Sequence, residues 1–70
     1  MKAKFSVYVL DDYKALLGVA NTAFQVQVLV EKTSPVAFCD IEIIDNDLNA
    51  KYSYYEFADE YNLEIGAYVK

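Results

Sequence analysis

Apolar and polar residues alternate at the start of the chain. Between residues 3 and 10, every second residue is apolar, and Lys4, Ser6 and Tyr8 separate these positions. A period of two is typical of a β-strand that buries one face, because successive side chains of a strand point to opposite sides. We therefore expect a strand over residues 3–10. Its inward face consists of Ala3, Phe5, Val7 and Val9.

The middle of the chain alternates in the same way. Residues 23–32 read AFQVQVLVEK, with apolar and polar side chains on opposite sides, and predict a second strand. The turn sequence KTSP follows, where Pro35 has a fixed φ and no N–H to donate to a neighbouring strand. The next segment, VAFCDIEII at residues 36–44, predicts a third strand. Residues 24–44 would then form a β-hairpin.

A helical period appears in SYYEFADEYN, which begins at Ser53. Its aromatic and small residues recur at i, i+3, i+4 and i+7 with acids on the opposite side, which predicts a helix over residues 54–62. Ser53 and Glu56 have the spacing of a capping box, in which each side chain accepts a hydrogen bond from the other residue's backbone N–H. Tyr52 and Phe57 occupy the two positions of a hydrophobic staple.

Residues 11–21, DDYKALLGVAN, fit two kinds of element. As a helix they would carry an apolar stripe of Leu16, Val19 and Ala20, although Gly18 weakens a helix interior by about 1 kcal/mol relative to alanine. As a strand they would alternate through Tyr13, Ala15, Leu17 and Val19.

These elements predict an α+β fold with a small antiparallel sheet and one or two helices on one face. Residues 1–70 would form one domain, and the alternation of Ile65, Ala67 and Val69 predicts a short last strand. A helical segment 11–21 gives the order βαββαβ, the ferredoxin-like arrangement, which we favour. The alternative is a β-meander with one helix at about residues 54–62. Either version leaves a candidate apolar patch of Tyr8, Leu29, Phe38 and Ile44.

The charged residues argue against several functions. All six basic residues are lysines, and the chain has no histidine and a net charge of −5. Arginine provides the fork that suits phosphates and guanine edges, and a negative chain repels a phosphate backbone, so we expect no direct binding to nucleic acid. Without histidine the chain lacks the usual general base near neutral pH and the usual transition-metal ligand. We therefore expect no enzyme, no catalytic residues and no cofactor.

The chain has one cysteine, Cys39, so it cannot form an internal disulfide. Cys39 alternates with Ile41 and Ile43 and has acidic neighbours, which predicts a small core residue and not a reactive thiol. No stretch is long and apolar enough to span a membrane, and the first residues do not match a signal peptide. We expect a cytoplasmic protein without a membrane partner.

Residues 45–56, DNDLNAKYSYYE, nearly match the spacing of a twelve-residue calcium loop. Asp45, Asp47, Asn49 and Glu56 would supply the oxygen ligands. The sixth position, where the loop needs glycine for a sharp turn, is Ala50, and a strand-like segment precedes the loop in place of a helix. We therefore favour the capping box over a calcium site, and expect no metal ligands.

Acidic residues are concentrated in the second half of the chain. Residues 1–39 contain four lysines and three acids, a net charge of +1, whereas residues 40–70 contain two lysines and eight acids, a net charge of −6. Asp59 and Glu60 lie towards the end of the predicted helix, where negative charge opposes the helix dipole. Solubility alone is one explanation for these acids. A binding surface for a basic protein is the other.

We expect the chain to bind and modulate or inhibit a larger protein with a basic surface. Charge speeds encounter and tyrosine supplies contact area at low entropy cost. Small acidic phage and mobile-element proteins inhibit host enzymes in this general manner, and carboxylates can imitate the nucleic acid of a basic groove. The alternative is a homodimeric ligand-binding or assembly module, joined through a sheet edge or the open sheet face. The expected partner-binding residues are Asp45, Asp47, Tyr52, Tyr55, Glu56, Asp59, Glu60 and Glu64.

Overall fold

The computed structural model describes residues 3–10, 12–33 and 38–68. The described chain has the order ββαββα, with a short 3₁₀ helix, η1, before the third strand. The elements are β1 (Phe5–Leu10), β2 (Lys14–Ala20), α1 (Ala23–Thr33), η1 (Phe38–Asp40), β3 (Ile41–Asp45), β4 (Ala50–Ser53) and α2 (Tyr54–Glu60).

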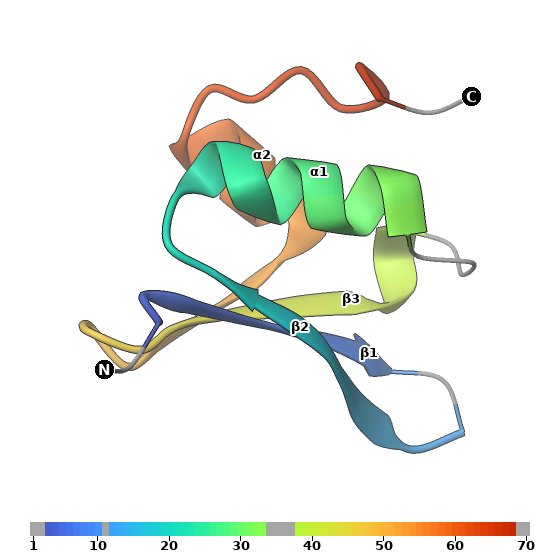
Figure 1. Cartoon of the computed structure of the whole chain (residues 1–70), viewed down its shortest axis with the longest axis vertical. Coiled ribbons are helices and arrows are strands. Elements are labelled where there is room, and N and C mark those ends of the chain that lie inside the picture. The colour runs from blue at the N-terminus through green and yellow to red at the C-terminus, as the bar shows by residue number, and fades with distance from the viewer. Residues whose placement is uncertain (1–2, 11, 34–37, 69–70) are drawn as a thin grey trace.

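The strands form one antiparallel sheet in the order β2-β1-β3-β4. Both helices lie on the same side of this sheet, with α1 over β2 and β1 and α2 over β3 and β4 (Figure 1). The predicted α+β class, with an antiparallel sheet covered by helices on one face, is confirmed. The favoured βαββαβ order is not the order observed, since two strands precede the first helix.

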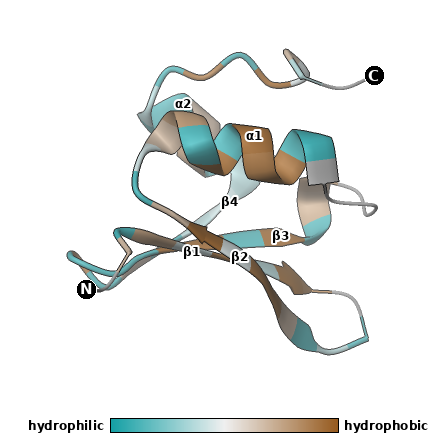
Figure 2. Ribbon diagram, in the orientation of Figure 1, coloured by the Kyte–Doolittle hydropathy of each residue, from teal (hydrophilic) through white to brown (hydrophobic). Residues whose placement is uncertain are grey.

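The core lies between the sheet and the helices. Hydrophobic residues colour much of the sheet and the middle of α1 (Figure 2). Aromatic rings meet edge to face in this core, with centroids 5.2 Å apart for Phe5 of β1 and Phe57 of α2, and 5.1 Å apart for Phe38 of η1 and Tyr54 of α2. The buried cluster consists of Phe5, Val7, Ala20, Val26, Val30, Ile41, Ile43, Tyr54 and Phe57.

The predicted first strand is confirmed as β1, with Phe5 and Val7 buried against the helices. Residues 14–20 form a strand and not the favoured helix. A bulge interrupts the pairing of β1 and β2: Val7 pairs with Gly18 and Tyr8 with Leu16, so Leu17 is the extra residue. The bulge shifts the alternation, and Ala20, not Val19, enters the core.

The predicted strand over residues 23–32 is wrong, because this segment forms α1. Its buried residues recur at helical spacing, with Val26 and Val30 in the core and Gln27 and Glu31 beside them. Its start resembles a capping box: Thr22 Oγ accepts from Gln25 N at 3.1 Å, and Gln25 Oε1 accepts from Asn21 N at 2.9 Å. The predicted hairpin over residues 24–44 is therefore wrong too.

Two more predicted strands differ from the structure. The third strand is real but starts only at Ile41, since residues 38–40 form η1; Cys39 in that turn is exposed and is not a core residue. Residues 65–68 form turns in place of a last strand, while Val69 lies outside the described residues. The sequence also did not indicate β4, which forms the second sheet edge.

The predicted apolar patch is split between two places. Tyr8 and Ile44 lie on the open face of the sheet, since their strand neighbours Val7 and Ile43 face the helices. Leu29 and Phe38 are half-buried and pack against the core. Those two residues cannot contribute to an open-face patch.

Candidate protein-interaction site

The α2 helix begins with the predicted capping box. Ser53 Oγ accepts from Glu56 N at 3.1 Å, and Glu56 Oε1 accepts from Ser53 N at 3.0 Å. The predicted staple is also present, with the ring centroids of Tyr52 and Phe57 5.9 Å apart. Such caps satisfy backbone N–H groups that have no partner inside the helix. The cap sets where α2 starts and therefore which of its residues face outward.

The α2 helix has a buried side and an acidic side. Tyr54, Phe57 and Ala58 are buried. The other residues of the helix, Tyr55, Glu56, Asp59 and Glu60, are exposed and follow the i, i+1, i+4, i+5 spacing of one helix face. We call these four residues the α2 acidic face.

No lysine of the described chain forms an ion pair with the α2 acidic face. The ion pairs between described residues join Lys4 to Asp45 and Asp47, and Lys14 to Glu42. The last turn of α2 contains no basic residue. The three carboxylates of the face therefore have no ion-pair partner among the described residues, although Lys51 lines the same hollow as Glu56.

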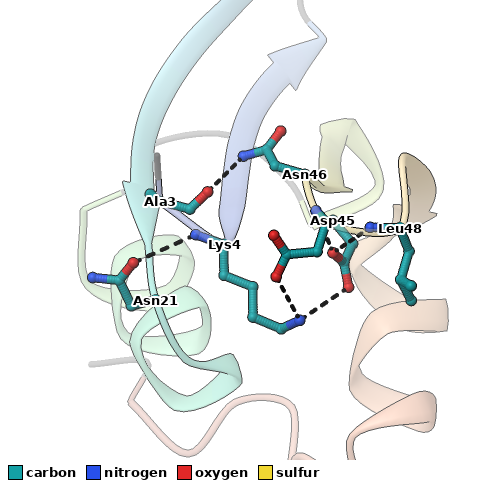
Figure 3. Close-up of polar contacts among 7 residues, drawn as sticks. Ala3, Lys4, Asn21, Asp45, Asn46 and Leu48 are labelled. Carbon is teal, nitrogen blue, oxygen red and sulfur yellow. Dashed lines mark hydrogen bonds and ion pairs between the residues drawn. The ribbon is translucent and has the colours of Figure 1, made fainter. Parts of the chain in front are cut away.

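Asp45, one of the expected contact residues, is fully buried. Its Oδ1 accepts from the backbone N–H groups of Asp47 (3.0 Å) and Leu48 (3.1 Å), and its Oδ2 lies 3.5 Å from Lys4 Nζ (Figure 3). Burial raises the pKa of Asp45, but the two N–H donors and Lys4 together outweigh burial and lower it. Asp45 therefore shapes the β3–β4 turn and cannot touch a partner directly.

Asp47 lies on the outside of the same turn, where its Oδ2 is 3.4 Å from Lys4 Nζ. Figure 3 shows the lysine ammonium between the carboxylates of the turn, while the Asn46 amide donates to the backbone oxygen of Ala3. Burial lowers the pKa of Lys4, but the charges of Asp45 and Asp47 outweigh burial and raise it. Lys4 thus neutralises part of the negative charge expected for this turn.

The calcium-loop geometry is absent from residues 45–56. Asp45 and Glu56 hold a turn and a helix cap, and the strand β4 separates them. A calcium loop would need the sharp turn at Ala50, but the residue with a positive φ is Asn49 (54°), and Ala50 begins β4. Within residues 3–10, 12–33 and 38–68, no group of three or more histidine, cysteine or acidic side chains could hold a metal ion.

A buried carboxylate that the sequence patterns did not single out lies on α1, in contact with Tyr54 of α2. Glu31 of α1 is only 8% exposed and accepts hydrogen bonds from Tyr54 Oη at 2.5 Å, Gly66 N at 2.9 Å and Tyr68 N at 2.9 Å. Gln27 Nε2 adds a contact at 3.3 Å to Glu31 and donates to the backbone oxygen of Glu64 at 2.5 Å. These bonds hold the segment after α2 across α1 (Figure 1).

The hydrogen bonds to Glu31 favour its charged form. Burial raises the pKa of Glu31, but the donors Tyr54, Gly66, Tyr68 and Gln27 outweigh burial and lower it. Burial, together with the hydrogen bond to Glu31 and its charge, strongly raises the pKa of Tyr54. Gly66 has a φ of 94°, a left-handed conformation that favours glycine. The spacing of Thr22 and Gln25 in the sequence is that of a helix cap, and this pattern could have placed Glu31 on a helix.

The structure therefore separates the eight expected contact residues. Tyr55, Glu56, Asp59 and Glu60 share one helix face, and Glu64 is exposed beyond its end. Asp47 is exposed on the β3–β4 turn, and its side chain is ion-paired. Asp45 is buried, and half-buried Tyr52 packs against the core. The candidate contact surface is therefore the α2 acidic face, and Glu64 and Asp47 are exposed outside this helix.

No helix in the described ranges is long and apolar enough to cross a membrane. Comparison with known proteins found no protein-family model, no curated protein and no solved structure that matches the chain.

Proposed function

We propose that the chain binds a larger protein with a basic surface through the α2 acidic face, and so modulates or inhibits that protein in the cytoplasm. The observation that supports this proposal is that Glu56, Asp59 and Glu60 are all exposed and that none of them forms an ion pair with a described lysine. Lysine or arginine side chains of a partner would supply the ion-pair partners. Exposed Tyr55 would add contact area at low entropy cost.

The arrangement of acids is costly for the isolated helix. Asp59 and Glu60 lie in the last turn of α2, where the helix dipole disfavours negative charge. Glu56 and Glu60 are like charges at i, i+4, which repel each other by a few tenths of a kcal/mol. Solubility needs acids somewhere on the surface and does not require them at these positions. A binding role accounts for their location.

The partner class that fits this face is a protein with a basic groove that normally holds nucleic acid. Residues at i+3 and i+4 on a helix have Cβ atoms about 5–6 Å from that of residue i, so the three carboxylates form a compact cluster of negative charge. A groove that attracts a phosphate backbone would attract such a cluster by the same electrostatic force. The chain would then compete with nucleic acid for the groove.

The test is capture from a lysate of the native host, with matched charge reversals. Glu60→Lys and Asp12→Lys each change the net charge by two units, and both positions are exposed. We expect Glu60→Lys to lose the captured partner and Asp12→Lys, in the β1–β2 turn, to keep it. Mass spectrometry would identify the partner. Added double-stranded DNA should release it from the wild-type chain if the groove is shared.

Equal capture by both variants would reject the α2 acidic face as the contact surface. Equal loss in both would mean that net charge alone carries the interaction. Release by salt but not by DNA would retain the basic partner and reject the nucleic-acid groove. Circular dichroism of each variant checks that the fold is unchanged.

A further inference from the structure

The exposed hydrophobic residues gather at the sheet edge opposite α2. Five of the eight large hydrophobic residues that are exposed in the described part of the chain lie on β2 or directly beside it. We call them the β2 surface. They are Leu10 (38% exposed), Tyr13 (76%), Leu16 (58%), Val19 (57%) and Phe24 (56%).

Two further features mark this edge as a contact surface. An open groove of about 680 Å³ is lined by Val19, Phe24, Gln25, Val28 and Leu29, between β2 and α1. β2 is also the longer edge strand, and no described strand pairs with its outer side. Its sequence, KALLGVA, has no proline, so Lys14 and the bulge at Leu17 are the features of this strand that protect an exposed edge, and residues 18–20 carry no charge.

We infer that a second copy of this chain covers the β2 surface, forming a two-fold dimer edge to edge. In an antiparallel pairing centred on Leu17, Lys14 would lie opposite Ala20 of the second copy, so the two lysines do not meet. The strand is thus compatible with itself, as a two-fold contact requires. Because the bulge at Leu17 bends β2, we expect the side chains of Leu16, Val19 and Phe24 to supply most of the contact.

Two copies, each with a net charge of −5, repel each other least when they meet at this edge. In the order β2-β1-β3-β4, neighbouring strands are about 4.8 Å apart, so β4 and the overlying α2 lie roughly 14 Å from β2. That separation exceeds the Debye length of about 8 Å at physiological ionic strength. A dimer joined at β2 would keep its two acidic faces at its far ends. Contact through any surface near α2 would bring them together.

The test is the mass of the purified chain in solution as its concentration rises. Sedimentation equilibrium of the wild-type chain should show a rise to twice the mass of one chain by millimolar concentration. Val19→Lys should raise the dimer dissociation constant at least about tenfold, because it places charges on both sides of the contact. Leu48→Lys, at a residue that is 69% exposed on the β3–β4 turn, is the matched control and should leave the constant unchanged.

A chain that stays monomeric over the whole range would overturn the inference. A dimer that Val19→Lys leaves intact, or that Leu48→Lys also weakens, would place the contact elsewhere and overturn it too. Isotope-filtered NMR on mixed labelled and unlabelled wild-type protein gives a test without mutation. It should show contacts between Val19 or Leu16 of one copy and the β2 surface of the other. The result is independent of the proposed function, since it needs no partner.

Discussion

Glu31 on α1 and Glu60 on α2 carry the same carboxylate in opposite surroundings. Glu31 is buried and receives hydrogen bonds from Tyr54, Gly66, Tyr68 and Gln27. Glu60 is exposed, and no described lysine forms an ion pair with it. The inner acid holds the fold together, whereas the outer acid slightly weakens its helix. A carboxylate's contribution to stability in this protein therefore depends on its donors and not on its charge alone.

Removing the inner charge should have the largest effect. Glu31→Gln keeps the shape of the side chain but points an amide NH₂ towards donors that need an acceptor. We expect the free energy of unfolding to fall by about 2–3 kcal/mol, measured by urea denaturation. Glu64→Gln is the matched control, since that side chain is exposed, and should change it by less than about 0.5 kcal/mol. Equal effects would remove the distinction between the two kinds of acid.

Low pH should destabilise the fold by protonating the buried carboxylates of Glu31 and Asp45. The folded-state pKa values of Glu31 and Asp45 lie below the ordinary values of 4.5 and 3.8, so the unfolded chain takes up protons first as the pH falls. The stabilisation is complete above the ordinary values and is lost as the pH drops through the lowered ones. We expect thermal unfolding to move to lower temperature below about pH 4. Glu31→Gln should flatten this dependence, and an unchanged slope would contradict the role of Glu31.

Reversing the outer charge should have the smallest effect, and the opposite sign. Glu60→Lys removes the repulsion of Glu56 and complements the end of the helix dipole, so we expect a gain of about 0.5 kcal/mol in the free energy of unfolding. Glu64→Lys, outside the helix, should give no such gain. A loss of stability in Glu60→Lys would show that Glu60 has a structural role and would weaken the case for binding.

Patterns within short stretches of sequence correctly predicted β1 and the start of α2. The alternation of residues 3–10 gave β1, and the spacing of Ser53 and Glu56 gave the start of α2, because both patterns act within one element. The alternating valines of residues 23–32 led to the wrong prediction of a strand. The segment is a helix because it buries Val26 and Val30, which are four residues apart, against the core. β-Branched residues are common in strands but are tolerated in helices that are packed on one side.

The candidate site was predictable only in part for the same reason. The exposed acids of α2 follow from helix periodicity alone. The burial of Asp45 depends on the turn that it organises and on Lys4, which comes from the other end of the sequence. Similarly, the hydrogen bonds to Glu31 come from Gly66 and Tyr68, and no local pattern links these residues to α1.

The hydrogen bonds from Gly66 and Tyr68 to Glu31 set the order in which parts of the chain can fold during synthesis. Glu31 accepts hydrogen bonds from the backbone N–H groups of Gly66 and Tyr68, which come 35 and 37 positions later in the chain. A ribosome makes α1 well before it makes those donors, so the carboxylate has to stay hydrated until residues 66–68 emerge. Contacts over such separations form only after the entropy cost of closing the loop between them has been overcome. We therefore expect α1 to dock fully only when the last turns of the described chain are available, which makes this docking a late event in folding.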